Sequence, residues 1–210
     1  MTGAAGAIGR ASVAALVGEG ATVVGIDLRE VDDTGAHAFL GCDLTVEDDV
    51  RDLYASVVEK YGRIDGLFNN AGVALAEDTS VLVEDLSIFD RTLRVNVDSV
   101  LLCCKHGIGH LIASGGGAVV NTASLVASMG SAVSQIGYTA SKGAVVAMSR
   151  EMAVEFARKG VRVNTLSPGP VRSPMLDALF TPDQIARRMV HVRPDGSGQR
   201  RRWPPPRSSS

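Results

Sequence analysis

Short runs of β-branched and aliphatic residues alternate with longer amphipathic stretches from residue 2 to about residue 167. This alternation is typical of βαβ units, in which helices connect the parallel strands of one sheet. Because such connections are short and right-handed, the pattern favours an α/β fold with a doubly wound parallel sheet. It predicts strands at Thr22–Ile26, Ala38–Leu40, Gly66–Phe68, Ala118–Asn121 and Val161–Leu166, and helices at Gly9–Glu19, Val46–Tyr61, Ser87–Ala113 and Tyr138–Lys159.

Residues at both ends of the second predicted helix indicate where it begins and ends. Thr45, with Asp48 three residues later, is the predicted N-cap. Gly62 is the predicted end of the helix, because glycine readily adopts the left-handed conformation that terminates helices.

The chain has 210 residues, of which 45% are hydrophobic, and this is enough for one domain with a substantial core. We expect that domain to span residues 1–190. Residues 191–210 lack periodicity and are rich in Arg, Pro and Ser, which predicts a disordered tail. Because the tail holds five arginines and one acidic residue, residues 1–190 carry 16 basic and 22 acidic side chains. We therefore expect no nucleic-acid partner, and a basic nucleic-acid tail is the weaker alternative.

No stretch approaches the roughly 20 apolar residues of a membrane span, and the N-terminus lacks the pattern of a secretory signal. We therefore expect a cytoplasmic protein without a membrane partner. Cys42, Cys103 and Cys104 form no C-x-x-C pair and are predicted to be reduced. His106 and His110 stand four residues apart beside two of these thiols, but no carboxylate completes the set, so we favour packing over a metal site.

Glycines recur every third residue just before the first predicted helix. Glycine allows a tight turn and lets a pyrophosphate approach the helix N-terminus, where free N–H groups favour negative charge. The candidate dinucleotide-binding residues of this loop are Gly3, Gly6, Ile8 and Gly9. A simple turn is the alternative for the loop taken alone.

An acidic residue, Asp27, ends the strand that follows this loop and helix. A carboxylate at that position accepts hydrogen bonds from both hydroxyls of an adenosine ribose and repels a 2′-phosphate. The sequence therefore favours NAD over NADP as the cofactor, although the nearby Arg29 weakens this preference. A turn or helix cap is the alternative role for Asp27.

Two further segments follow predicted strands where a bound dinucleotide would need contacts. Asp43 and Leu44 offer a carboxylate and a backbone amide to the adenine ring. Asn70, Ala71 and Gly72 follow the third strand, where small residues let the backbone pass the cofactor and side-chain amides brace neighbouring strands.

A tyrosine and a lysine, Tyr138 and Lys142, stand four residues apart on a predicted helix and so share one face. A tyrosine acting as a base near neutrality needs its pKa lowered by roughly 3 units, or about 4 kcal/mol. One ammonium about 4 Å away at an effective dielectric near 20 supplies about 4 kcal/mol, so we expect Lys142 to lower the pKa of Tyr138. Ser124, 14 residues before the tyrosine at a strand end, is expected to hold the substrate oxygen.

Taken together, these motifs resemble the short-chain dehydrogenase/reductase family, and the likeness runs from Thr2 to about Val190. The resemblance implies a Rossmann-like fold, a small-molecule substrate and a homodimer or homotetramer built on two long helices. It also implies that Asn96 holds a water that relays protons from the lysine. Pro168 and Gly169 are the positions that this likeness assigns to the nicotinamide side of the cofactor.

The predicted activity is hydride transfer between a nicotinamide cofactor and a secondary alcohol or ketone. One alternative is a catalytically inactive dinucleotide-binding or interaction protein of the same fold. A nucleotide-sugar epimerase, which shares the glycine spacing and the Tyr-Lys pair, is a third. The substrate stays open among steroids, acyl thioesters, sugars and small ketones, because the expected pocket segments, Val126–Ile136 and Met175–Val190, are apolar and not diagnostic.

The sequence departs from the family at both ends. Family members begin with a strand ahead of the Thr-Gly, whereas only Met1 precedes Thr2 here, so we expect a sheet without its first strand. Near Asp195 the sequence turns to Arg, Pro and Ser where a last strand is expected. Our hypothesis is that the chain is a version of a complete enzyme altered at its start site and reading frame. DNA sequence upstream of Met1 and across codons 190–196 tests it.

Overall fold

The computed structural model describes residues 1–28, 34–131, 133–171, 173 and 181. Within these residues, parallel strands alternate with helices in the order expected for an α/β fold. The elements are α1 (Ala7–Gly18), β1 (Val24–Asp27), β2 (Ala38–Gly41), α2 (Glu47–Tyr61), β3 (Gly66–Asn69), α3 (Leu86–Leu93), a π-helical turn (Arg94–Asp98), α4 (Ser99–Ala113), β4 (Gly117–Thr122), α5 (Val126–Met129), α6 (Ile136–Phe156), a 3₁₀ turn (Ala157–Lys159) and β5 (Val161–Leu166).

All the strands and helices predicted from the sequence are present, with ends shifted by a few residues. The helix predicted over Ser87–Ala113 is divided into α3 and α4 by the π-helical turn, and the short α5 was not predicted. Gly62 ends α2 with φ +79°, as expected. The predicted cap of α2 is wrong: Val46 takes the N-cap position, and the Thr45 hydroxyl instead donates to the Asp43 carboxylate at 2.7 Å.

The strands form two parallel groups, β1–β2 and β3–β4–β5. Met1 and Thr2 link the two groups through their backbones. The Ile26 amide on β1 donates to the Met1 carbonyl at 2.9 Å, and the Thr2 amide donates to the Phe68 carbonyl on β3 at 2.9 Å. Thr2 forms a single isolated parallel bridge with Ile26, so these two residues connect the groups without forming a strand.

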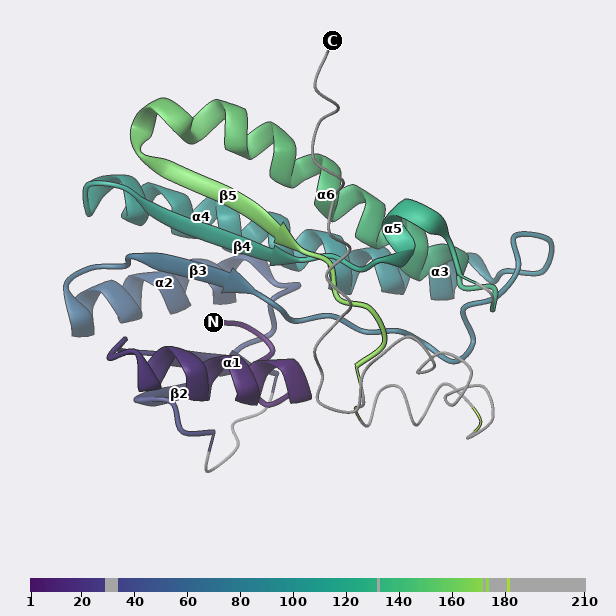
Figure 1. Ribbon diagram of the computed structural model, residues 1–210, viewed down its shortest axis with the longest axis horizontal. Helices are drawn as coiled ribbons and strands as arrows, with labels where there is room; N and C mark the ends of the chain where they lie inside the picture. Colours follow the sequence, from purple (N-terminus) through teal and green to yellow (C-terminus); the bar gives the residue numbers. More distant parts are fainter. Residues whose placement is uncertain (29–33, 132, 172, 174–180, 182–210) are drawn as a thin grey trace, which may run out of the picture. The chain divides into compact units, whose positions relative to one another are not determined.

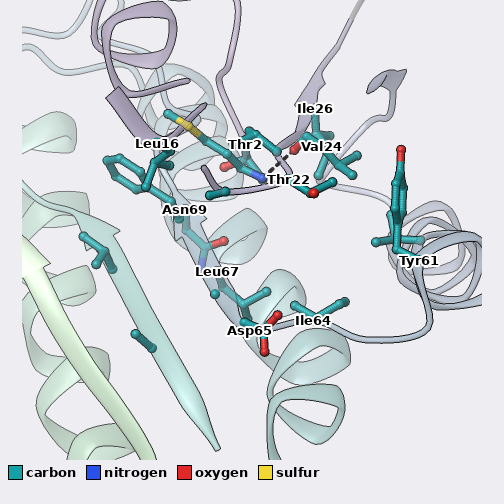
Figure 2. Close-up of a pocket in the computed structure, with 18 of the residues that line it drawn as sticks. Thr2, Leu16, Thr22, Val24, Ile26, Tyr61, Ile64, Asp65, Leu67 and Asn69 are labelled. Carbon is teal, nitrogen blue, oxygen red and sulfur yellow. Dashed lines mark hydrogen bonds between the residues drawn. The ribbon is translucent and has the colours of Figure 1, made fainter. Parts of the chain in front are cut away.

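A cavity of about 670 Å³ lies between β1 and β3 beyond Met1. Figure 2 shows side chains of Val24 and Ile26 from β1 and of Leu67 and Asn69 from β3 around it. The Met1 ammonium is directed to the Val24 carbonyl, at 2.8 Å. Burial lowers the pKa of this amine from 8.0 to about 6, because the surroundings disfavour its charged form.

The core has two parts, on the two sides of the strands. The larger part packs α2, α4 and α6 against the strands and includes Val50, Leu111, Val119 and Val145. The smaller part gathers around Val13 of α1, a helix that Figure 1 shows in purple beside β2. Helices on both sides of a parallel sheet make a doubly wound α/β fold, as predicted.

Residues Met1–Gly169 form one compact unit. The predicted tail at 191–210, most of the second expected pocket segment and Arg29 all lie outside the described residues. In the described part, β5 pairs only with β4. No described helix combines the length and apolar character needed to cross a membrane.

Candidate active site

The glycine loop before α1 is tightly folded. Gly3 has φ +62°, and a Cβ there would lie 2.8 Å from the Ala71 amide nitrogen. A Cβ at Gly9 would lie 2.0 Å from the Gly3 carbonyl oxygen. Gly6 is the N-cap of α1, which has neither a side-chain cap nor an acidic residue in its first turn. Because the first N–H groups of a helix, including that of Ile8, lack intrahelical partners, this end fits an anionic pyrophosphate.

Thr2 and Asn70 fasten the glycine loop to the end of β3. The Thr2 hydroxyl accepts hydrogen bonds from the amides of Asn70 at 3.0 Å and Ala71 at 3.1 Å. The Asn70 side chain donates to the Gly3 carbonyl at 3.2 Å and accepts from the Thr122 hydroxyl at 3.3 Å. The Asn70 side chain therefore braces the glycine loop and β4 against the end of β3, as predicted for this segment. Thr2 itself was missed, although its position just before Gly3 was a usable signal.

Asp27 ends β1 beside this loop and is half-buried. Its carboxylate accepts from the Ala5 amide at 3.1 Å and from the Leu28 amide at 2.9 Å. The turn-cap interpretation of Asp27 is thus confirmed. Each carboxylate oxygen can accept a further hydrogen bond, so the capping role does not exclude contact with a ribose.

Asp43 and Leu44 follow β2 near the end of β1, where the Cys42 amide donates to the Asp27 carbonyl at 2.9 Å. One Asp43 oxygen accepts from both the amide and the hydroxyl of Thr45. Leu44 is 7% exposed and packs in the main core. Among the described hydrogen bonds, none joins either residue to the glycine loop.

Tyr138 and Lys142 lie one turn apart on α6, as predicted. Lys142 is 3% exposed, and its ammonium donates to the Thr122 carbonyl at the end of β4, at 2.9 Å. The same ammonium lies 5.6 Å from the centre of the Tyr138 ring. Ser124 follows β4 and interacts with the Tyr138 phenol through its side chain. The structure therefore brings together three of the four predicted catalytic side chains, those of Ser124, Tyr138 and Lys142.

The predicted lowering of the Tyr138 pKa is wrong for the protein without ligand. Burial raises the pKa of the phenol above its usual value of 10.0, and only the hydrogen bond from Ser124 opposes the rise. Burial also lowers the pKa of Lys142 to about 8. Removing both groups from water disfavours their charged forms, and this cost outweighs the attraction between them.

Asn96 lies fully buried in the π-helical turn. Its side-chain oxygen accepts from the Val73 amide at 2.7 Å, and its side-chain nitrogen donates to the Val73 carbonyl at 2.9 Å and to the Ser141 hydroxyl at 3.0 Å. The side chain thus braces the segment after β3 against α6. A Cβ at Gly72 would lie 3.0 Å from Asn96 Oδ1 and 3.3 Å from Lys142 Nζ, so Gly72 leaves room for both groups.

A chain of buried polar side chains lies behind the site. The Asn69 amide donates to the Asn121 side-chain oxygen at 2.8 Å, and the Asn121 amide donates to the Ser149 hydroxyl at 2.9 Å. These contacts join β3, β4 and α6. Sequence reasoning missed Asn121 and Ser149, because neither belongs to a local motif.

Pro168 and Gly169 follow β5 at the same edge of the sheet. The Pro168 carbonyl accepts from the Leu125 amide at 3.0 Å, next to Ser124. His106, one of the residues considered for a metal site, lies 3.1 Å from the Glu47 carboxylate, which also accepts a hydrogen bond from Lys105. In the part of the chain that the structure describes, no three His, Cys, Asp or Glu side chains are placed to hold a metal.

Comparisons with known proteins agree with this geometry. A family model described as Enoyl-(Acyl carrier protein) reductase matches residues 3–200. The chain is 36% identical over 192 residues to 2,5-dichloro-2,5-cyclohexadiene-1,4-diol dehydrogenase of Sphingobium indicum, covering 87% of this chain and 76% of the relative. It is 34% identical over 206 residues to cis-4-hydroxycyclohexanecarboxylate dehydrogenase of Sinomonas cyclohexanicum, covering 93% and 81%.

Solved structures agree as well. A short-chain dehydrogenase/reductase from Burkholderia xenovorans is similar with a TM-score of 0.84 and 32% identity, covering 91% of this chain and 80% of that one. An NAD⁺-bound xylitol dehydrogenase is similar with a TM-score of 0.75 and 33% identity, covering 81% and 70%. With the glycine loop, the Tyr-Lys pair and the parallel sheet in place, the chain belongs to the short-chain dehydrogenase/reductase family of oxidoreductases.

Proposed function

We propose that this protein is an NAD-dependent dehydrogenase that interconverts a secondary alcohol and a ketone. The observation that carries the proposal is the convergence of Ser124, Tyr138 and Lys142 at the edge of the sheet where the glycine loop also lies. At this edge of a doubly wound sheet, ligands bind beyond the carboxyl ends of the strands.

A dinucleotide fits the described residues. The pyrophosphate would lie at the uncapped start of α1, and the adenosine ribose beside Asp27. Asn70, Ala71 and Gly72 would line its path, and Tyr138 and Lys142 would meet the nicotinamide ribose. When bound, the nicotinamide supplies the hydride acceptor for oxidation and the hydride donor for reduction. The carboxylate of Asp27 supports NAD over NADP, because it would repel a 2′-phosphate.

The chain's own residues handle the proton and the oxygen of the substrate. In ketone reduction, the Tyr138 phenol donates its proton to the carbonyl oxygen while Ser124 holds that oxygen by a hydrogen bond. In oxidation, the Tyr138 oxygen accepts the hydroxyl proton. The Lys142 ammonium, 5.6 Å from the centre of the Tyr138 ring, is placed to stabilise the negative charge that develops on the tyrosine oxygen as the phenol gives up its proton.

The raised pKa of Tyr138 gives the two directions different pH dependence. Because the phenol form dominates near neutrality, the proton donor for reduction is present there. The base needed for oxidation forms only as the pH rises. We expect the rate of alcohol oxidation to rise through the alkaline range, while ketone reduction is already active near pH 7.

The names of the two curated relatives point to a first choice of substrate. Both describe dehydrogenases of an alcohol carried on a six-membered carbon ring. A secondary alcohol on such a ring is therefore the substrate class that we propose to test first. As in the family, we also expect a homo-oligomer built on the long helices α4 and α6.

Turnover by the purified 210-residue chain tests the proposal directly. The assay follows NADH or NADPH absorbance with cyclic and acyclic secondary alcohols and the matching ketones. Tyr138→Phe is expected to lower kcat by about 1000-fold, while the Kd for NADH stays within about twofold. Tyr61→Phe is the matched control and should leave kcat unchanged. Substantial turnover in Tyr138→Phe would contradict the catalytic assignment.

A dinucleotide-binding protein without turnover is the second candidate. The observation that favours it is the cavity between β1 and β3, where no direct strand pairing joins the two strand groups among the described residues. NADH binding without turnover on the whole panel of alcohols and ketones would support this candidate over the enzyme.

A further inference from the structure

The helix that carries both Tyr138 and Lys142, α6, begins only two residues before the tyrosine, at Ile136. The first four N–H groups of a helix have no partner within it and must be satisfied from outside. The N-cap residue of α6, Gln135, provides no side-chain hydrogen bond. The start of the catalytic helix therefore depends on groups from elsewhere in the chain.

Those groups come from Asp78 and Thr79, in the segment between β3 and α3. The Thr79 carbonyl accepts from the Ile136 amide at 3.2 Å. One oxygen of Asp78 accepts from the Gly137 amide at 2.9 Å, and the other accepts from the Tyr138 amide at 2.6 Å. Two adjacent residues thus satisfy three successive N–H groups, and the last of these belongs to the catalytic tyrosine.

The Asp78 carboxylate is built into this position. It is 6% exposed, and a negative charge at a helix N-terminus is favoured by the helix dipole. A Cβ at Gly137 would lie 3.3 Å from the Asp78 carboxylate, so glycine keeps the approach open. The Asp78 amide donates to the Leu75 carbonyl at 3.2 Å, and the next amide, that of Thr79, donates to the Glu84 carboxylate at 2.6 Å.

We propose that Asp78 is a positioning residue that sets the location of the Tyr138 phenol relative to Ser124 and Lys142. This inference rests on the proposed function. Asp78 contacts the Tyr138 backbone and acts on the reaction only through the tyrosine. Since a displacement of about 1 Å in a reacting group lowers a rate by about 100-fold, loss of this clamp lowers kcat without removing any reacting atom.

Asp78→Ala and Asp78→Asn test the proposal, and Asp85→Ala is the matched control. Asp85 is also an aspartate at a helix start, where it caps α3 by accepting from the Ser87 amide at 2.8 Å. We expect Asp78→Ala to lower kcat by about 10- to 100-fold with the Kd for NADH within about twofold. Asp78→Asn keeps one acceptor oxygen, so its kcat should lie between that of Asp78→Ala and that of the parent. Asp85→Ala should keep the parental kcat.

A second readout needs no turnover. In protein labelled with ¹³C at the tyrosine ζ-carbon, the Tyr138 signal is assigned by its loss in Tyr138→Phe. We expect this signal to move in Asp78→Ala and Asp78→Asn, and to stay in place in Asp85→Ala. Because the spectrum is recorded without substrate, an inactive parent chain would count against the proposed function and would leave this test of Asp78 intact.

Three results would overturn the role of Asp78. One is an unchanged kcat in folded Asp78→Ala or Asp78→Asn. Another is an equal loss in Asp85→Ala, which would indicate a general effect of uncapping. The third is a Tyr138 signal that stays in place in both Asp78 variants.

Discussion

The two parts of the compact unit are held together very differently. The part that carries the catalytic residues, β3 to β5 with α4 and α6, has strands paired over four to six residues and amides locked between them. The part that would bind the nucleotide, α1 with β1 and β2, has two strands of four residues each. It reaches β3 through the backbones of Met1 and Thr2, the Thr2 hydroxyl and the Asn70 side chain.

The residues proposed for catalysis and those proposed for nucleotide binding therefore lie in different parts of the unit. The proton-handling side chains stand on strands and helices that pair with one another more extensively than with the glycine loop. The loop in turn depends on a few contacts around Thr2. Changes in the nucleotide part should therefore alter cofactor binding and local stability first, and leave the catalytic part folded.

Gly9→Ala is expected to have the largest effect. Its Cβ would lie 2.0 Å from the Gly3 carbonyl oxygen and 2.8 Å from Ala4 backbone atoms, so the loop must move. Such overlap with backbone is strongly unfavourable, and we expect the Kd for NADH to rise by about 1000-fold, or about 4 kcal/mol. Fluorescence titration with NADH measures this change.

Gly18→Ala, on the same helix with open space around its Cβ, is the control and should bind NADH as the parent does. Hydrogen exchange gives a second check on the comparison. Amides of α4 and α6 should remain protected in Gly9→Ala. Loss of their protection would mean that the two parts unfold as one.

The buried Met1 amine predicts the next effect. Because its pKa is about 6 in the folded protein against 8.0 for an ordinary amine, the unfolded chain binds its proton more strongly between these values. The free energy of unfolding should therefore rise between pH 6 and pH 8, by about 2 to 3 kcal/mol from this group. Urea unfolding across this range measures it.

An N-terminally acetylated chain isolates the contribution of Met1, since it keeps an N–H group and has no charge to bury. Its free energy of unfolding should exceed that of the parent at pH 6, and the difference should vanish above pH 8. A constant difference across the range would mean that the amine is not buried in solution.

Asp27→Asn is expected to have the smallest effect of the three. The substitution keeps the shape that meets the Ala5 and Leu28 amides but removes the negative charge. The ratio of kcat/KM for NAD to that for NADP should fall by about tenfold, or about 1.4 kcal/mol. Asp90→Asn, at an exposed position on α3, serves as the control. An unchanged ratio would mean that Asp27 caps the turn and does not set the preference for NAD over NADP.

Local patterns predicted much of this molecule. The glycine spacing and the four-residue spacing of Tyr138 and Lys142 depend on backbone geometry within one turn, which the sequence carries directly. Strand and helix positions follow from hydrophobic periodicity for the same reason.

Features that depend on distant partners were not predictable. Asp78 meets α6 from about 60 residues away, and nothing in its own neighbourhood distinguishes it from a surface aspartate. The pKa of Tyr138 depends on burial, which the spacing of two residues does not report. Asn96 was found through family likeness, but its bonds to Val73 and Ser141 require the π-helical turn in three dimensions.

The amide chain from Asn69 through Asn121 to Ser149 has a consequence for how the sheet assembles. Strands buried on both faces are largely apolar, so an adjacent strand paired in a shifted register would still bury apolar surface. A displaced β4 would leave the Asn69 and Asn121 amides without partners inside the protein, which is costly. The hydrogen bonds among these three polar side chains therefore favour a single register of β3, β4 and α6. Any shifted register would leave buried amides without partners.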